Sequence, residues 1–174
     1  MKLFTYTILT IGLAFLCSAC HKEGKQLTEL EKKTIIDSAK TVVKKVFDLS
    51  NRLEYKKALL YYSGDNDTRY IDNGSIYPSF DAMKKEYELV GPSMELVENK
   101  IQKWDAVFLG NEAVSFTLPI RLKLKVKGLP SYEGQYIWSG IVQKRKGKWL
   151  IIQSHASWLN YAEVIAALTP KSNK

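Results

Sequence analysis

The clearest pattern in the chain is a strict alternation of apolar and polar residues between Val114 and Val126. Valine, phenylalanine, leucine or isoleucine occupies every second position, whereas serine, threonine, arginine and lysine fill most positions between them. Successive side chains of a strand point to opposite faces of its sheet, so a period of two places all the apolar residues on one face. The pattern therefore predicts a long antiparallel strand with one buried and one solvated face.

Other extended segments lie on both sides of this strand in the sequence. Residues 94–110 are predicted to be extended and to turn at Gly110-Asn111. Tyr132–Arg145 is the next predicted strand, and a tight turn at Lys146-Gly147 leads into the last strand, Lys148–Trp158. A short C-terminal helix is predicted over about Tyr161–Leu168. The second half of the chain therefore consists mainly of strands.

The first half has the spacing of helices instead. Thr28 and Glu31 form a capping-box pattern, and apolar residues recur at helical spacing from Ile35 to Phe47, which predicts a long amphipathic helix ending near Ser50. Helices followed by long strands indicate an α+β fold, with the sheet curled around the first helix. Further elements are predicted from turn and capping residues: a short helix over about Leu53–Tyr62, two short strands joined at Asn73-Gly74, and a helix over Phe80–Val90 between Ser79 and Gly91-Pro92.

Residues 1–19 have the pattern of a secretory signal peptide. One lysine, a short apolar run and the small pair Ser18-Ala19 precede Cys20. The segment resembles the lipobox of bacterial lipoproteins, which implies cleavage before Cys20 and lipid attachment to its thiol, although Cys17 stands where the lipobox favours an aliphatic residue. An ordinary cleaved signal or a simple N-terminal anchor is the alternative.

This leader predicts how the chain is organised. We expect a lipid-anchored linker over residues 20–27, one α+β domain over residues 28–168 and a short tail over residues 169–174. The N-terminal lipid would hold the protein to a membrane on the exported side of the bacterial cell envelope, either the outer membrane or the periplasmic face if the cell is Gram-negative.

Cysteine and charge content narrow the classes of function. Both cysteines, Cys17 and Cys20, precede the predicted domain, which can therefore form neither an intrachain disulfide nor a cysteine metal site. From Cys20 onward, 25 basic residues face 18 acidic ones, a net charge of +7 that suits an anionic membrane surface or solubility alone. With one histidine in the domain and no ligand spacing among its acids, we expect no metal and no cofactor. We also expect no nucleic-acid binding, because the chain is exported and lacks a basic-aromatic motif.

The order of the predicted elements and two motifs resemble the nuclear-transport-factor-2-like, or SnoaL-like, superfamily. "GKWLIIQSHASW", with Trp149, Ile151, His155 and Ser157, looks like the final strand of that family, and "RYIDNGSIYPSFDAM" looks like its hairpin leading into the third helix. The resemblance covers about Thr28–Trp158. It implies a cone-shaped, curved antiparallel sheet wrapped around about three N-terminal helices, with a pocket at one end. Some members are isomerases, cyclases or dehydratases and many are dimeric binding modules, so the fold does not settle the function.

His155 is the one chemically suggestive residue of the predicted domain. Alternation along the last strand places His155 on the same face as Trp149, Ile151 and Ser157, and we expect this face to line the pocket. The alternative is that Leu150 and Ile152 form the core and His155 faces solvent.

As a general base, His155 would need an acid to orient it. Asp72 is the candidate, with Asp65 and Asp67 as further acids that folding could bring near. Candidate aromatic walls of the pocket are Tyr61, Tyr62, Tyr70, Tyr136 and Trp138, although such residues are more often ordinary core or rim.

Three hypotheses for function remain open from the sequence. The leading one is an envelope lipoprotein whose domain binds a small apolar or amphipathic ligand, or a protein partner, in or around the cone. The second is a small isomerase, dehydratase or hydrolase that uses His155 as base. The third is a structural module that forms a homodimer through the outer face of the sheet.

A basic row lies on the solvated face of the long strand. Either it contacts anionic lipid headgroups or an acidic partner, or it only keeps that face solvated. The residues of this row are Arg121, Lys123, Lys125 and Lys127.

Overall fold

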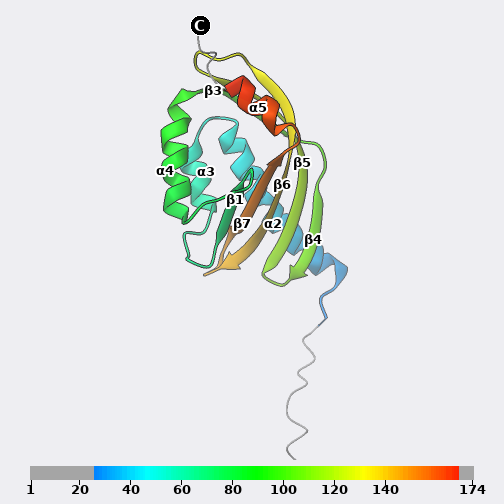
Figure 1. Ribbon diagram of the computed structural model, residues 1–174. Helices are drawn as coiled ribbons and strands as arrows, with labels where there is room; N and C mark the ends of the chain where they lie inside the picture. Colours follow the sequence, from blue (N-terminus) through cyan, green and yellow to red (C-terminus); the bar gives the residue numbers. More distant parts are fainter. Residues whose placement is uncertain (1–25, 169–174) are drawn as a thin grey trace, which may run out of the picture.

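Seven strands form one curved sheet that stays open, and a long helix packs against its concave side (Figure 1). The computed structural model describes residues 26–168. The strands are β1 (Arg69–Asp72), β2 (Ser75–Ile76), β3 (Met94–Ile101), β4 (Asp105–Gly110), β5 (Ala113–Val126), β6 (Tyr132–Arg145) and β7 (Lys148–Trp158).

The helices precede or follow the long strands in sequence, and the α+β class is confirmed. The predicted second helix is shorter than expected and continues as a single 3-10 turn. The helices are α2 (Glu29–Ser50), α3 (Tyr55–Ala58), α4 (Phe80–Val90) and α5 (Tyr161–Leu168), with 3-10 turns η1 (Leu59–Tyr61) and η2 (Gly91–Ser93).

Helix α2 forms where the capping pattern predicts it. The Thr28 hydroxyl accepts a hydrogen bond from the Glu31 backbone N–H at 3.2 Å, and the Glu31 carboxylate accepts one from the Thr28 N–H at 2.8 Å. These reciprocal bonds satisfy donors that the first turn leaves free. The helix buries one apolar stripe, including the fully buried Ala39 and Val43, against the inner face of the sheet.

The strand order is β2-β1-β7-β6-β5-β3, with β4 also paired to β5. Every neighbouring pair is antiparallel except β1 and β7, which run parallel, so the sheet is mixed rather than wholly antiparallel. Tyr62 already bridges Ile151 in a parallel sense before β1 begins. The chain therefore enters the sheet beside β7 and in the same direction.

The extended segment 94–110 is two strands rather than one. β3 pairs with the second half of β5 and β4 with its first half. At the break, the carbonyl of Pro119 accepts a hydrogen bond from the Gln102 N–H at 2.8 Å. Since proline has no N–H to offer the edge strand there, the ladder on this side of β5 is interrupted between β3 and β4.

A bulge in β7 changes which residues face the inside of the sheet. Val142 of β6 is opposite Ile151, but the preceding residue, Ile141, is opposite Gln153, so Ile152 is the extra residue. A bulge of one residue reverses the inside-outside alternation beyond it. Ile151 and Ser154 are consequently both buried, three positions apart.

The predicted leader, Cys20, most of the linker and the C-terminal tail lie outside the described residues. Among residues 26–168, no helix is long and apolar enough to cross a membrane.

Candidate ligand-binding site

A cavity of about 200 Å³ lies between α2 and the inner face of the sheet. Its walls come from α2, from the segment around α3 and η1, from α4 and from five strands. Aromatic rings dominate the lining: Phe47, Tyr55, Tyr62, Tyr70, Tyr77, Tyr87, Tyr136, Trp138 and Trp158. Of the predicted aromatic walls, Tyr62, Tyr70, Tyr136 and Trp138 line this cavity, whereas Tyr61 does not.

The aromatic rings are locked by packing against one another. Tyr136 stacks on Trp158, with ring centroids 5.4 Å apart and planes at 24°, and Phe47 meets Trp138 edge to face at 5.7 Å. Trp138 can lie flat over its own strand because residue 140 is glycine. A β-carbon there would stand 2.5 Å from Cη2 of Trp138.

Hydrogen bonds fix the position of Tyr136 on the inner face of β6. Its hydroxyl donates to Oδ1 of Asn99 at 2.8 Å. Asn99 is itself held by Asn51, the C-cap residue of α2. The Asn51 Oδ1 accepts from the Asn99 backbone N–H at 2.7 Å, and the Asn51 Nδ2 donates to the Asn99 carbonyl at 3.1 Å. The end of α2, β3 and β6 are thus tied together at this wall.

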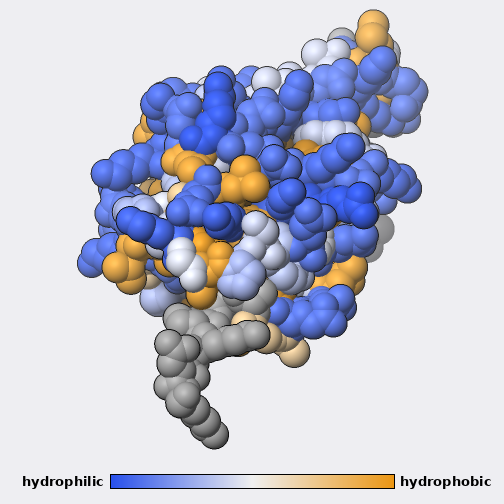
Figure 2. Space-filling model, turned by 90° about the horizontal axis from the view of Figure 1, so that it is seen from above, coloured by the Kyte–Doolittle hydropathy of each residue, from blue (hydrophilic) through white to orange (hydrophobic). Residues whose placement is uncertain are grey.

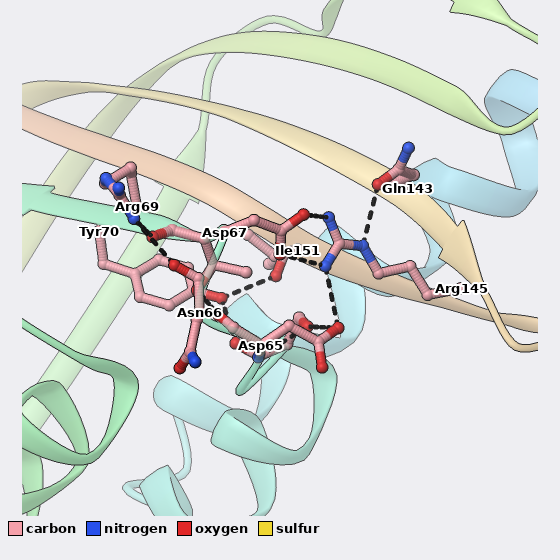
Figure 3. A network of polar contacts seen from close by, with 10 residues as sticks. Asp65, Asn66, Asp67, Arg69, Tyr70, Gln143, Arg145 and Ile151 are labelled. Carbon is pink, nitrogen blue, oxygen red and sulfur yellow. Dashed lines mark hydrogen bonds and ion pairs between the residues drawn. The ribbon is translucent and has the colours of Figure 1, made fainter.

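A second network holds the segment of residues 63–70 against β6 and β7 (Figure 3). The buried hydroxyl of Tyr70 lies 2.6 Å from the carbonyl of Ser63 and 3.0 Å from that of Ile151, so its one proton is shared between them. Beside it, the Arg145 guanidinium binds Asp67 through two nitrogens and Asp65 through one, at 2.7–2.9 Å. These acids brace the loop rather than orient His155.

Asp72 is the one carboxyl group that lines the cavity. Burial raises the pKa of Asp72 above its ordinary value, and the carboxylate of Glu86 adds to the rise, whereas Trp158 and His155 oppose it. The indole N–H of Trp158 is close enough to Asp72 to lower its pKa. It makes no hydrogen bond, and the buried Nε1 atom has no partner among the described residues. A half-buried carboxyl with an elevated pKa is a feature of functional sites.

The tyrosine hydroxyls of the cavity remain protonated at neutral pH. Burial raises the pKa of Tyr70 to about 12. Burial also raises the pKa values of Tyr62 and Tyr136 well above the ordinary value of a tyrosine. Each phenol therefore stays a hydrogen-bond donor and acceptor rather than a charge.

A smaller cavity of about 160 Å³ adjoins the first and is called the outer cavity below. The two cavities share Tyr55, Asp72, Tyr77 and Tyr87 as lining residues. The outer cavity is completed by Glu86, Val90, Gly91 and Met94. Asp72 thus lies where the two spaces meet.

The structure corrects the expectation that His155 faces the pocket. His155 lies opposite Ser139 of β6, on the outer face, because the bulge at Ile152 shifts the alternation by one residue. In the pairing of β7 with β1, His155 lies opposite Ile71, whereas Asp72 lies opposite Ala156. No hydrogen bond of the His155 ring occurs within residues 26–168, so the expected pair of His155 and Asp72 does not form.

The other residues of the last strand divide between the two faces. Trp149 and Ile151 precede the bulge and pack into the core, but neither lines the cavity. Ser157 lies exposed on the outer face. The inner positions belong instead to Ser154, Ala156 and Trp158, which all line the cavity.

The basic row lies on the outer face of the sheet, and ion pairs neutralise two of its four residues. Lys123 pairs with Glu133 at 3.2 Å and Lys125 with Glu95 at 3.1 Å. No ion pair of Arg121 or Lys127 is found in the described part of the chain. Contact of this row with anionic lipid, and homodimerisation through this face, stay predictions.

Sequence reasoning did not place Tyr55, Tyr77 or Tyr87 in the pocket. Their positions in α3, after β2 and in α4 carry no local signal that they converge, and only the packing of α3 against α4 brings the rings of Tyr55 and Tyr87 to 5.7 Å. Within the described residues, no three histidine, cysteine or carboxylate side chains cluster as metal ligands.

The sequence matches no protein-family model. It also matches no curated protein.

Solved structures are similar to this chain in fold. A type 2 hexachlorocyclohexane dehydrochlorinase (LinA) matches with TM-score 0.66 and 10% identity, over 76% of this chain and 90% of the other. A ketosteroid isomerase-like protein from Erwinia carotovora atroseptica matches with TM-score 0.59 and 14% identity, over 72% and 95%. A nuclear transport factor 2 (NTF2-like) superfamily protein from Salmonella enterica serovar Typhimurium matches with TM-score 0.62 and 11% identity, over 76% and 93%.

The described chain therefore has the NTF2-like fold, a curved open sheet around helix α2 with an aromatic cavity inside it.

Proposed function

We propose that this protein is a lipoprotein of the bacterial cell envelope whose domain binds a small apolar or amphipathic molecule. The observation that carries the binding part is the aromatic cavity, which is apolar over most of its wall and contains a few polar groups at set positions. That combination is typical of small-molecule sites. The leader that ends at Ser18-Ala19-Cys20 supports the envelope part.

The cavity limits the size of the ligand part that it holds. Its volume is about 200 Å³, somewhat more than the roughly 150 Å³ of an engineered apolar cavity that binds benzene. One ring with a small substituent fits this space. Tyrosine hydroxyls and Asp72 would then select a ring that carries a hydroxyl or carbonyl group, because buried polar groups favour a ligand that satisfies them.

The surface on the side of the molecule seen in Figure 2 is compatible with a small ligand. Hydrophobic residues emerge there in small groups among hydrophilic ones rather than as one broad patch. Broad exposed apolar patches mark protein or membrane contacts, so this face favours a ligand that enters the fold.

The binding proposal is tested by titrating the protein with monocyclic phenols and cyclic ketones and following ligand signals by saturation-transfer NMR. Trp138→Ala should change the affinity of any binder at least several-fold, whereas Trp149→Ala, which changes a core tryptophan outside the cavity lining, should not. Binding that responds equally to both substitutions would contradict a site in the aromatic cavity.

The lipoprotein proposal has an independent test in bacterial cells. Metabolic labelling with an alkyne fatty acid should mark the protein, and Cys20→Ser should abolish the label and release the protein from the membrane fraction. Cys17→Ser is the matched control, because this residue is lost with the leader, and should leave both unchanged. A label that survives Cys20→Ser would refute lipid attachment at this residue.

A second candidate function is proton transfer by Asp72. The raised pKa of this carboxyl, caused first by burial, brings it closer to the range in which a general base exchanges protons near neutral pH. Deuterium exchange at the α-carbon of cyclic ketones, followed by NMR, tests this candidate. Exchange that requires Asp72 and is lost in Asp72→Asn would favour an enzyme over a binding module.

A further inference from the structure

The outer cavity has an unusual combination of lining groups. Three tyrosines, Tyr55, Tyr77 and Tyr87, form much of its wall, and its only charged residues are the two carboxylates of Asp72 and Glu86. The remaining lining is apolar or glycine. A small space walled by electron-rich rings and negative charges is a suitable environment for a positive group.

The rings and the carboxylates are near enough to act on one another. Burial raises the pKa of Tyr77 and of Tyr87, and the charges of Asp72 and Glu86 contribute to the rise at both phenols. The planes of Tyr55 and Tyr87 meet at 49°, as adjacent walls would. Gly91 permits this arrangement, because a β-carbon there would come within 3.2 Å of the Tyr55 ring.

The chemistry of the lining excludes other classes of ligand for this space. An inorganic or organic anion would meet two negative charges and no compensating cation. A metal ion would find only two carboxylates, and no cluster of three ligand side chains exists in the described chain. A neutral group would leave both carboxylates without a partner of opposite charge. These two negative charges stand together in a protein whose formal net charge is +8.

We propose that the outer cavity binds an organic ammonium group, so that the ligand of the domain is an amphipathic cation whose apolar part enters the aromatic cavity. Ammonium groups are attracted to the faces of aromatic rings, and quaternary ammonium ions are bound by cages of such rings. Carboxylates beside the cage add Coulomb attraction, which is stronger at the half-buried Asp72 than at the exposed Glu86. This inference rests on the proposed ligand-binding function and specifies its ligand class.

The size of the outer cavity fits this group. A volume of about 160 Å³ corresponds to about five water-sized groups at roughly 30 Å³ each. An ammonium nitrogen with up to four carbon substituents has that many heavy atoms. Asp72 lies at the junction of the cavities, so the cation and the apolar part of one molecule would meet beside it.

The test compares three probes on the full-length protein purified in an uncharged detergent, at constant ionic strength. Benzyltrimethylammonium carries the cation and a ring, neopentylbenzene is its neutral isostere, and tetramethylammonium is the cation alone. Affinities are measured by saturation-transfer NMR against detergent blanks. We expect benzyltrimethylammonium to bind at least tenfold more tightly than neopentylbenzene, and tetramethylammonium to bind weakly.

Variants locate the cation. Glu86→Gln and Asp72→Asn should each weaken benzyltrimethylammonium binding three- to tenfold and leave neopentylbenzene within twofold. Glu98→Gln, on the exposed outer face of β3, makes the same change in net charge and should have no effect. Tyr87→Phe keeps the ring and should retain binding, whereas Tyr87→Leu should lose it. Glu86 and Tyr87 both lie exposed on α4, so we expect the fold to tolerate these substitutions.

The outcomes separate this inference from the function on which it rests. Equal binding of the cation and its isostere would overturn the ammonium site and leave a ligand-binding domain. A preference for the cation that persists in both Glu86→Gln and Tyr87→Leu would also overturn it. If none of the probes binds, and the phenols and ketones do not bind either, the proposed function fails together with the inference.

Discussion

Replacing Gly140 by alanine tests whether the wall of the aromatic cavity is as tightly built as the structure indicates. Residue 140 lies in the middle of β6, with the indole of Trp138 lying over it. The added β-carbon would stand 2.5 Å from Cη2 of Trp138 and 2.8 Å from the backbone carbonyl oxygen of Gln153. Carbon atoms in contact prefer separations of about 3.5–4.0 Å, so the indole would have to move by about 1 Å.

The sign of the effect is decided by two opposing contributions. Alanine reduces the freedom of the unfolded chain and, without a clash, would stabilise a strand by about 0.4–1 kcal/mol relative to glycine. Overpacking costs about 1–3 kcal/mol. Here one of the crowded atoms is the backbone oxygen of Gln153, which the pairing of β6 with β7 holds in place. We expect a net loss of about 2 kcal/mol in the free energy of unfolding, together with a smaller aromatic cavity as Trp138 shifts into it.

Urea unfolding followed by far-ultraviolet circular dichroism measures this change. With a denaturant slope of about 2 kcal/mol per molar, the midpoint should fall by about 1 M, and the melting temperature should fall by about 4–8 °C. Gly64→Ala is the control, because its β-carbon would only reach ordinary contact with Phe80 at 3.4 Å. A Gly140→Ala protein as stable as wild type, or more stable, would refute the packing of Trp138 described above.

Three further predictions concern single side chains. Tyr70→Phe should lower the free energy of unfolding by about 1–2 kcal/mol in urea, because the Ser63 carbonyl loses its buried donor, whereas Tyr161→Phe, at an exposed site, should not. Since the pKa of Asp72 is raised in the folded state, its contribution to stability is complete below the unfolded pKa and is lost as the pH rises through the folded pKa. The free energy of unfolding of Asp72→Asn should therefore increase relative to that of wild type as the pH rises. Urea titrations from pH 4 to 8 measure this, and a difference in the free energy of unfolding that does not change with pH would contradict it. His155→Ala should leave ligand affinity within twofold, because the ring lies on the outer face. A tenfold loss of affinity by NMR would contradict this outward orientation.

Local signals in the sequence were sufficient for most of the elements. The capping box of Thr28 and Glu31 predicts the start of α2, and the alternation from Val114 to Val126 predicts the buried face of β5. The positive φ angles of Asn73 and Lys146 occur at two of the predicted turns. Periodicity, capping and turn chemistry depend on residues close in sequence, so the chain alone carries this information.

Contacts between distant segments decided the site. The alternation of the last strand predicts that His155 faces inward, yet its pairing with β6 inserts a bulge at Ile152 and turns His155 outward. The same pairing places Trp158 in the cavity, and the parallel approach of β1 brings Asp72 beside it. The sequence by itself determined the elements and the apolar stripes that hold the cone together. Only the tertiary structure decided which polar residues enter the cavity, because strand register and bulges depend on partners far apart in the chain.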